Sequence, residues 1–88
     1  MKNRSRAHIV GRILEIANGG GATKTKIMYK AFLSYAQLKE YLTFLMDNGL
    51  LQRDQGRQFY RTTEKGIRVL QMYIQVHEMM SIDNVNKK

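Results

Sequence analysis

Residues 23–62 read TKTKIMYKAFLSYAQLKEYLTFLMDNGLLQRDQGRQFYRT, and this stretch decides the fold. Apolar residues recur at helical spacing in two segments, a short one from about Lys24 to Phe32 and a longer one that begins at Ser34. Thr23 can cap the first segment. Ser34 is followed three residues later by Gln37, which is the capping-box spacing. Gly49 suits the position just after the second helix, so the pattern predicts two helices joined by a tight turn.

The period then changes from helical spacing to that of strands. Residues 50–53 and 58–62 each predict a short strand, and residues 54–57 predict the turn between them. Gly56 is the residue of this turn that most easily takes a positive φ. The second half of the stretch therefore predicts a two-stranded hairpin.

Two further helices flank this stretch. Ser5 can cap a helix that runs to about Asn18, and the glycines at 19–21 stop it. A last helix is predicted from residue 64 to about residue 81. Gly66 lies in its first turn, where glycine costs helix stability, so we expect a close backbone contact there.

The element order is helix, helix, helix, hairpin, helix, which predicts a mainly α (α+β) winged helix-turn-helix fold. The third helix is the expected recognition helix, and residues 54–57 are the tip of a two-stranded wing. One domain is expected over residues 1–88, with a basic arm (1–4), a core (5–62), a C-terminal dimerisation helix (64–81) and a flexible tail (82–88). The predicted core residues are Ile13, Leu14, Ile27, Leu38, Leu42, Leu45, Leu51 and Tyr60.

Composition narrows the functional classes. The chain has 88 residues, no cysteine and a formal net charge of +8, so disulfides are excluded and an anionic partner is favoured. No apolar run approaches the ~20 residues of a membrane span, and the basic start does not resemble a signal peptide. We expect a cytoplasmic, nucleoid-associated protein without a cofactor, a membrane partner or an evident small-molecule ligand.

The residues 24–29 (KTKIMY), 33–35 (LSY), 41–42 (YL), Leu45 and 50–51 (LL) are similar to those of a group of archaeal winged-helix proteins. The hairpin exit TEKG at 63–66 resembles the same group, which includes small dimeric DNA-binding proteins first described from Sulfolobus chromatin. The resemblance covers about residues 7–80. It implies a winged-helix fold, a dimer through the C-terminal helix and DNA binding without a known effector. The predicted last helix, about four to five turns, is shorter than the coiled-coil rod of the chromatin-type members.

Three elements are predicted to contact DNA together. The outer face of the third helix would enter the major groove, and Arg57 at the wing tip would reach a minor groove. Glu40 lies on the groove-facing side, where it either accepts from a cytosine amino group or repels the backbone. The groove-facing residues are Gln37, Lys39 and Thr43, and the predicted phosphate contacts are Lys24, Lys26, Lys30, Ser34 and Tyr35.

Each of these basic groups also has an interpretation that involves no contact with DNA. The lysines of the second helix can form a solvated face, and Arg53 and Arg61 can be charges that blunt an edge hairpin. The arm residues Lys2, Arg4 and Arg6 either reach along DNA or form a disordered start. Tyr29 and Tyr41 are expected to pack inside, whereas the hydroxyl of Tyr35 is free to touch a phosphate.

The sequence gives only weak signals of a catalytic or metal-binding site. The glycines at 19–21 are followed by ATK, but a phosphate loop needs glycine directly before the lysine and a strand before the loop. His8 and His77 are the only histidines, and no acidic ligand cluster accompanies them. We therefore expect a binding protein with no catalytic residue and no metal site. His8 is expected to face solvent, and His77 to lie on an interhelical seam.

The last helix carries more apolar surface than one domain can cover. Ile67, Leu70 and Ile74 form one stripe that can pack on the domain, and an apolar arc wider than the usual ~100° implies a second surface. A two-fold pairing of these helices is the simplest cover, so a homodimer is predicted. The second stripe, the predicted dimer interface, consists of Val69, Met72, Val76, Met79 and Met80.

The leading hypothesis is a double-stranded DNA-binding protein, either a sequence-specific transcriptional regulator or an architectural nucleoid protein. A winged helix used as a protein-interaction module in a larger assembly, and RNA binding, are the alternatives.

Overall fold

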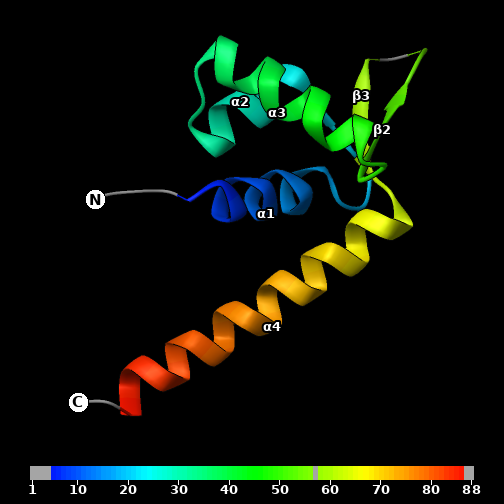
Figure 1. Ribbon diagram of the computed structural model, residues 1–88. Coiled ribbons are helices and arrows are strands. Elements are labelled where there is room, and N and C mark those ends of the chain that lie inside the picture. Colours follow the sequence, from blue (N-terminus) through cyan, green and yellow to red (C-terminus); the bar gives the residue numbers. More distant parts are fainter. Residues whose placement is uncertain (1–4, 57, 87–88) are drawn as a thin grey trace.

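The computed structural model describes residues 5–56 and 58–86, with side chains described as far as residue 80. The described residues form four helices and three strands in the order α1 (Arg6–Ala17), β1 (Ala22–Thr23), α2 (Lys24–Ala31), α3 (Tyr35–Asp47), β2 (Leu51–Asp54), β3 (Phe59–Thr62) and α4 (Glu64–Asn86). In Figure 1, α2, α3 and the strands lie on one side of α1, and α4 runs along its other side and away from it. The predicted winged-helix arrangement is confirmed.

The first helix begins and ends where the sequence predicts. The Ser5 hydroxyl accepts a hydrogen bond from the His8 amide at 3.1 Å, which caps α1. Asn18 is the C-terminal cap, and Gly19 follows it with a φ of +80°. The left-handed backbone at Gly19 ends the helix and turns the chain toward β1.

The helix-turn-helix is fixed by two caps and an unusual turn. Thr23 caps α2 by accepting from the Lys26 amide, and Ser34 and Gln37 form the full capping box of α3. Between them, Phe32 takes a left-handed conformation (φ 56°, ψ 54°), and the Leu33 amide donates to the Met28 carbonyl at 3.0 Å. The turn therefore closes without a glycine.

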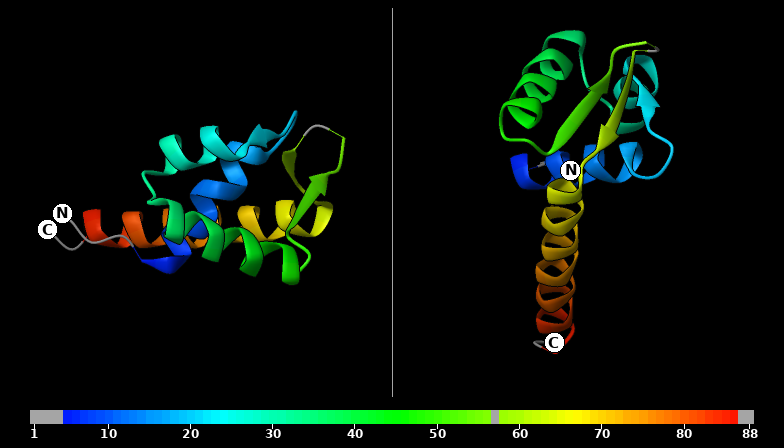
Figure 2. Two further views of the ribbon diagram at one scale, coloured as in Figure 1. Left: turned by 90° about the horizontal axis from the view of Figure 1, so that it is seen from above. Right: turned by 90° about the vertical axis from the view of Figure 1, so that its right-hand side faces the viewer.

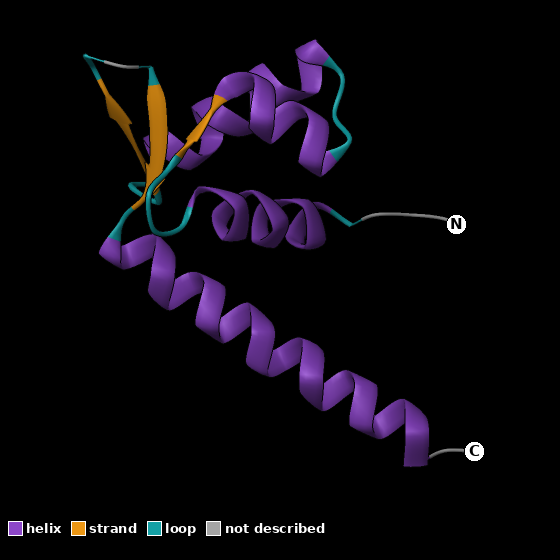
Figure 3. Cartoon of the chain, turned by 180° about the vertical axis from the view of Figure 1, so that it is seen from behind, coloured by secondary structure: helices purple, strands orange, loops and turns teal. Residues whose placement is uncertain are grey.

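The sheet has one strand more than the sequence predicted. β3 lies in the centre, paired antiparallel with β2 on one side and with the two-residue β1 on the other. β1 pairs Ala22 with Tyr60, so the start of α2 is tied to the central strand of the sheet (Figure 3). Gly56, which could take a positive φ, does not do so, whereas Gln58 has a φ of 58°.

One hydrophobic core holds these elements together, and all eight predicted core residues are buried in it. The chain passes from the wing to α4 through a tight junction. The Thr63 amide donates to the Leu50 carbonyl at 3.0 Å, and Gly66 presses against the same carbonyl. A Cβ on Gly66 would overlap the Leu50 oxygen and come within 2.7 Å of Thr62 Cγ2. The expected close backbone contact at Gly66 is confirmed.

The last helix is longer than predicted. α4 has 23 residues and continues to Asn86, so most of the segment 82–88 that was predicted as a flexible tail is helical. No glycine or proline follows residue 81, and polar residues alone do not end a helix. The helix extends well beyond the domain (Figure 2), and the molecule measures 50 × 27 × 20 Å. Among the described helices, none offers an apolar stretch long enough to cross a bilayer.

Candidate nucleic-acid interface

The predicted phosphate-contacting lysines lie on the outside of α2. Lys26 and Lys30 are exposed, and Lys24 is half-buried at the start of the helix. Lys24 shares a shallow surface pocket with Lys39 and Thr43 of α3, floored by the apolar residues Leu42, Met46 and Tyr60. The structure thus brings together residues from both helices that the sequence predicted as one site.

The first turn of α3 presents polar groups that its cap only partly uses. The Ser34 hydroxyl accepts from the Gln37 amide at 3.1 Å and keeps its own hydrogen for another acceptor. The Gln37 side-chain oxygen accepts from the Ser34 amide at 3.0 Å, so the side-chain nitrogen is the atom that can reach a partner. Tyr35 is exposed, and Lys39 Nζ lies 5.7 Å from the centre of its ring.

The positive charges on this side are not neutralised by neighbouring carboxylates. Over the described part of the chain, the single ion pair joins Arg12 to Glu15 in α1 at 3.2 Å. Glu40 and Asp47 are exposed on α3 and accept no salt bridge from a described lysine. The face formed by α2 and α3 therefore presents unpaired lysines to solvent.

The structure describes only some of the basic residues of the wing. Arg53 and Arg61 are exposed on β2 and β3, and both line a polar surface pocket with Gln52, Asp54 and Gln55. The Asp54 carboxylate accepts from the Gly56 amide at 3.1 Å, which shapes the turn. The predicted wing-tip contact Arg57 lies outside the described residues, as do Lys2 and Arg4 of the basic arm.

Two residues, one basic and one aromatic, lie differently from the sequence interpretation. Arg6 belongs to α1, where its guanidinium lies over the rings of Tyr41 and Phe44 at 5.1 and 5.8 Å, so it is not part of a free arm. Tyr41 is buried as predicted, but Tyr29 is 71% exposed, so the prediction that it packs inside was wrong. Neighbours in a helix point about 100° apart, and Tyr29 falls outside the inner face that Ile27 and Ala31 define.

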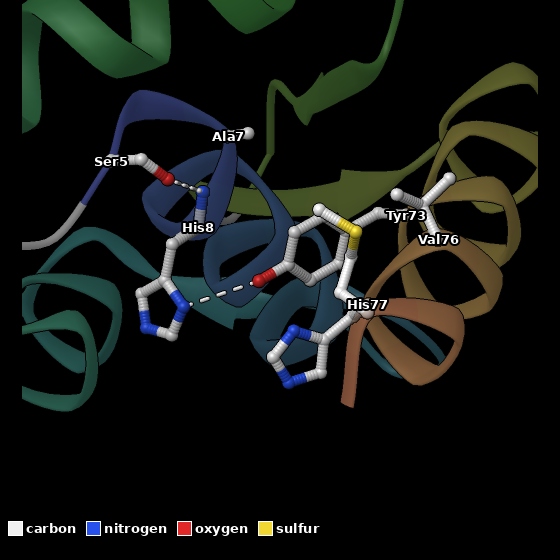
Figure 4. A pocket seen from close by; sticks show the side chains of 7 residues that line it. Ser5, Ala7, His8, Tyr73, Val76 and His77 are labelled. Carbon is white, nitrogen blue, oxygen red and sulfur yellow. Dashed lines mark hydrogen bonds between the residues drawn. The ribbon is translucent and has the colours of Figure 1, made fainter. Parts of the chain in front are cut away.

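The α1–α4 junction holds the two histidines. The Tyr73 hydroxyl lies 3.2 Å from His8 Nδ1, and the Tyr73 and His77 rings stack with centroids 5.8 Å apart (Figure 4). In the part of the chain that is described, no group of three potential metal ligands comes together. The junction also explains Gly11, where a Cβ would lie 2.8 Å from two ring atoms of Tyr73. Sequence reasoning missed this contact, although a glycine inside a helical pattern is its usual signal.

The predicted dimer residues are distributed over two environments. Met72, Val76, Met79 and Met80 are exposed, whereas Val69 packs partly on the core of its own domain. Ile74, predicted to face the domain, is 40% exposed. An open apolar groove on α4 is lined by Val69, Met72, Tyr73 and Val76.

Comparisons with known proteins agree with this architecture. A family model described as winged helix-turn-helix matches residues 3–81. An uncharacterized protein of Methanocaldococcus jannaschii is 31% identical over 81 residues, which is 92% of this chain and 78% of that protein. A second uncharacterized protein of the same organism is 30% identical over 80 residues, 91% of this chain but 37% of the longer relative.

Solved structures show the same fold. Sso10a-2, a DNA-binding protein from Sulfolobus solfataricus, superposes with a TM-score of 0.70 at 24% identity, over 96% of this chain and 95% of its own. Lactococcus lactis ZitR, solved in complex with DNA, has a TM-score of 0.67 at 19% identity, over 100% of this chain and 65% of its own. Because the family model covers most of the described residues and the fold is shared, the chain belongs to the winged helix-turn-helix family.

Proposed function

We propose that this protein binds double-stranded DNA with the face formed by α2 and α3. The observation that carries the proposal is the set of lysines on this face, Lys24, Lys26, Lys30 and Lys39, none of which has a described carboxylate partner. The two structural neighbours described as DNA-binding or DNA-bound support it. In this fold the second helix of the helix-turn-helix lies in the major groove, and that helix is α3.

Each element then has a distinct role. Lys26 and Lys30, together with Ser34 and Tyr35, contact phosphates and position the protein without reading sequence. Gln37, Lys39 and Thr43 lie on the exposed side of α3 and face the base edges. Arg57 at the wing tip reaches the neighbouring groove. Such a protein acts as a transcriptional regulator or an architectural protein of the nucleoid in the cytoplasm, by binding and not by catalysis.

The protein binds as a homodimer formed through α4. The apolar residues Met72, Val76, Met79 and Met80 of α4 are exposed. Exposed apolar area of this extent on a basic protein is costly in water, and pairing of two copies covers it. Two copies also place two α2–α3 faces on one DNA molecule.

Substitutions separate the phosphate contacts from the base contacts. We expect Lys26→Ala and Lys30→Ala to weaken binding to all duplexes alike and to reduce the slope of log K against log salt by about 1 each. Gln37→Ala and Lys39→Ala should change the preference among sequences. The exposed polar strip of α4 consists of Arg68, Gln71, Gln75 and Glu78. Arg68→Ala removes the same charge from this strip and should leave the slope unchanged. Fluorescence anisotropy on labelled duplexes measures all five variants, and equal slopes for Lys26→Ala, Arg68→Ala and the wild type would contradict the assignment.

A further inference from the structure

Three aromatic side chains are exposed around the turn between α2 and α3. Tyr29, Phe32 and Tyr35 are 71%, 79% and 58% exposed, and they lie within seven residues of the chain. We refer to these three residues as the aromatic patch. Other aromatic residues of the same domain, Tyr41 and Tyr60, are buried in the core. The fold therefore has room for aromatic rings inside but presents these three to solvent.

The backbone conformation of the turn does not favour a phenylalanine at position 32. Phe32 occupies the left-handed region with a φ of 56°. Glycine or asparagine normally occupies this C-terminal cap position, because a bulky side chain is disfavoured there. Phe32 thus has an unfavourable backbone conformation and also exposes a large apolar ring to water. Outliers of this kind point to a functional site.

Cations are interleaved with the rings of the patch. Lys26 and Lys30 are exposed on α2, whose sequence KTKIMYKA contains no acidic residue. On the other side of the turn, Lys39 Nζ lies 5.7 Å from the centre of the Tyr35 ring. The patch therefore combines flat apolar surfaces with exposed lysines on the same two helices.

This combination matches one class of ligand best. A DNA duplex presents phosphates but hides the faces of its bases, so exposed rings gain little from it. Unpaired strands present both phosphates and bare base faces, and stacking of bases on aromatic side chains beside lysines is the usual way of binding them. We propose that the aromatic patch binds single-stranded nucleic acid, with its rings stacked on unpaired bases and Lys26, Lys30 and Lys39 at the phosphates. This activity goes beyond the proposed duplex binding.

The test compares single strands with a duplex. Fluorescence anisotropy is measured with labelled, unstructured DNA and RNA strands of roughly 12 nucleotides and with a DNA duplex. The variants are Phe32→Asn, which removes the ring but tolerates the left-handed backbone, and Tyr29→Ala on the outer face of α2. Phe44→Ala is the matched control, because Phe44 is an exposed ring of α3 that lies under Arg6 and outside the patch. Circular dichroism at each step verifies that the variants are folded.

The wild type is expected to bind at least one kind of single strand, and comparison of the DNA and RNA strands shows which. Phe32→Asn and Tyr29→Ala should each weaken that binding by roughly tenfold, while Phe44→Ala and duplex affinity stay near the wild-type values. Failure of the wild type to bind either strand in low salt, or unchanged affinity in both patch variants, would overturn the proposal and leave a protein partner as the occupant of the patch. Equal losses on single strands and duplex would also overturn it, because the rings would then belong to the duplex interface.

Discussion

The hydroxyl of Thr62 in β3 donates a buried hydrogen bond of 2.7 Å to the carbonyl oxygen of Leu14 in α1. Leu14 lies in the last turn of α1, where carbonyls lack the helical donors that follow them. The Asn18 amide, which would otherwise serve Leu14, donates to Glu15. The wing strand β3 thus completes the end of α1 and ties the wing to that helix.

Replacement of Thr62 by valine should show what this bond contributes. Thr62→Val keeps the shape of the side chain but leaves the buried Leu14 carbonyl without this donor, so we expect the free energy of unfolding to fall by about 1–3 kcal/mol. Chemical denaturation at one fixed protein concentration measures the loss. Thr25→Val makes the same chemical change at an exposed position of α2 and should change stability by less than about 0.5 kcal/mol. Equal effects of the two substitutions would show that the bond is not a stabilising contact.

The junction between the wing and α4 depends on the absence of a side chain at Gly66. An alanine Cβ there would overlap the Leu50 carbonyl oxygen, which belongs to the backbone and cannot rotate away. We expect Gly66→Ala to lower the free energy of unfolding by about 1–3 kcal/mol despite the better helix propensity of alanine. Gly20→Ala is the control, because a Cβ at Gly20 meets nothing within 4 Å. A Gly66→Ala protein as stable as the control would contradict the described packing of α4.

The exposed apolar face of α4 predicts the state of association. Light scattering on dilute wild-type protein should give about twice the chain mass of 10.3 kDa. Val76→Glu places a charge in the paired face and should reduce the mass to that of one chain, because an unpaired buried charge is costly. Gln75→Glu adds the same charge to the polar strip next to it and should leave the dimer intact. A wild-type monomer at micromolar concentration would refute the proposed pairing.

The strongest predictions from the sequence concerned local chemistry and helical periodicity. Ser5, Thr23 and Ser34 all cap helices as expected, since a capping oxygen needs only an amide two or three residues away. The core was also predictable, because residues such as Leu42 and Leu45 recur on one face of a helix. Gly49 follows α3 with a φ of +73°, again a local requirement.

Features that depend on distant contacts were not predictable in this way. β1 is two residues long, too short for a pattern, and exists because Ala22 pairs with Tyr60 far along the chain. The exposure of Phe32 and Tyr29 could not be deduced from a helix as short as α2, where the inner face is defined by two buried residues. The length of α4 was underestimated because the residues after 81 carry no stop signal other than their polarity.

The central claim is that the lysine face of α2 and α3 binds duplex DNA, and a salt series on the wild-type protein tests it most directly. Fluorescence anisotropy with a labelled duplex should give binding in low salt whose affinity falls steeply and linearly on a log–log scale as salt rises, because phosphate contacts release counterions. The Lys26→Ala and Lys30→Ala variants should follow shallower lines. If the wild type shows no salt-dependent binding to any duplex in low salt, the claim is wrong, and the basic face serves another partner.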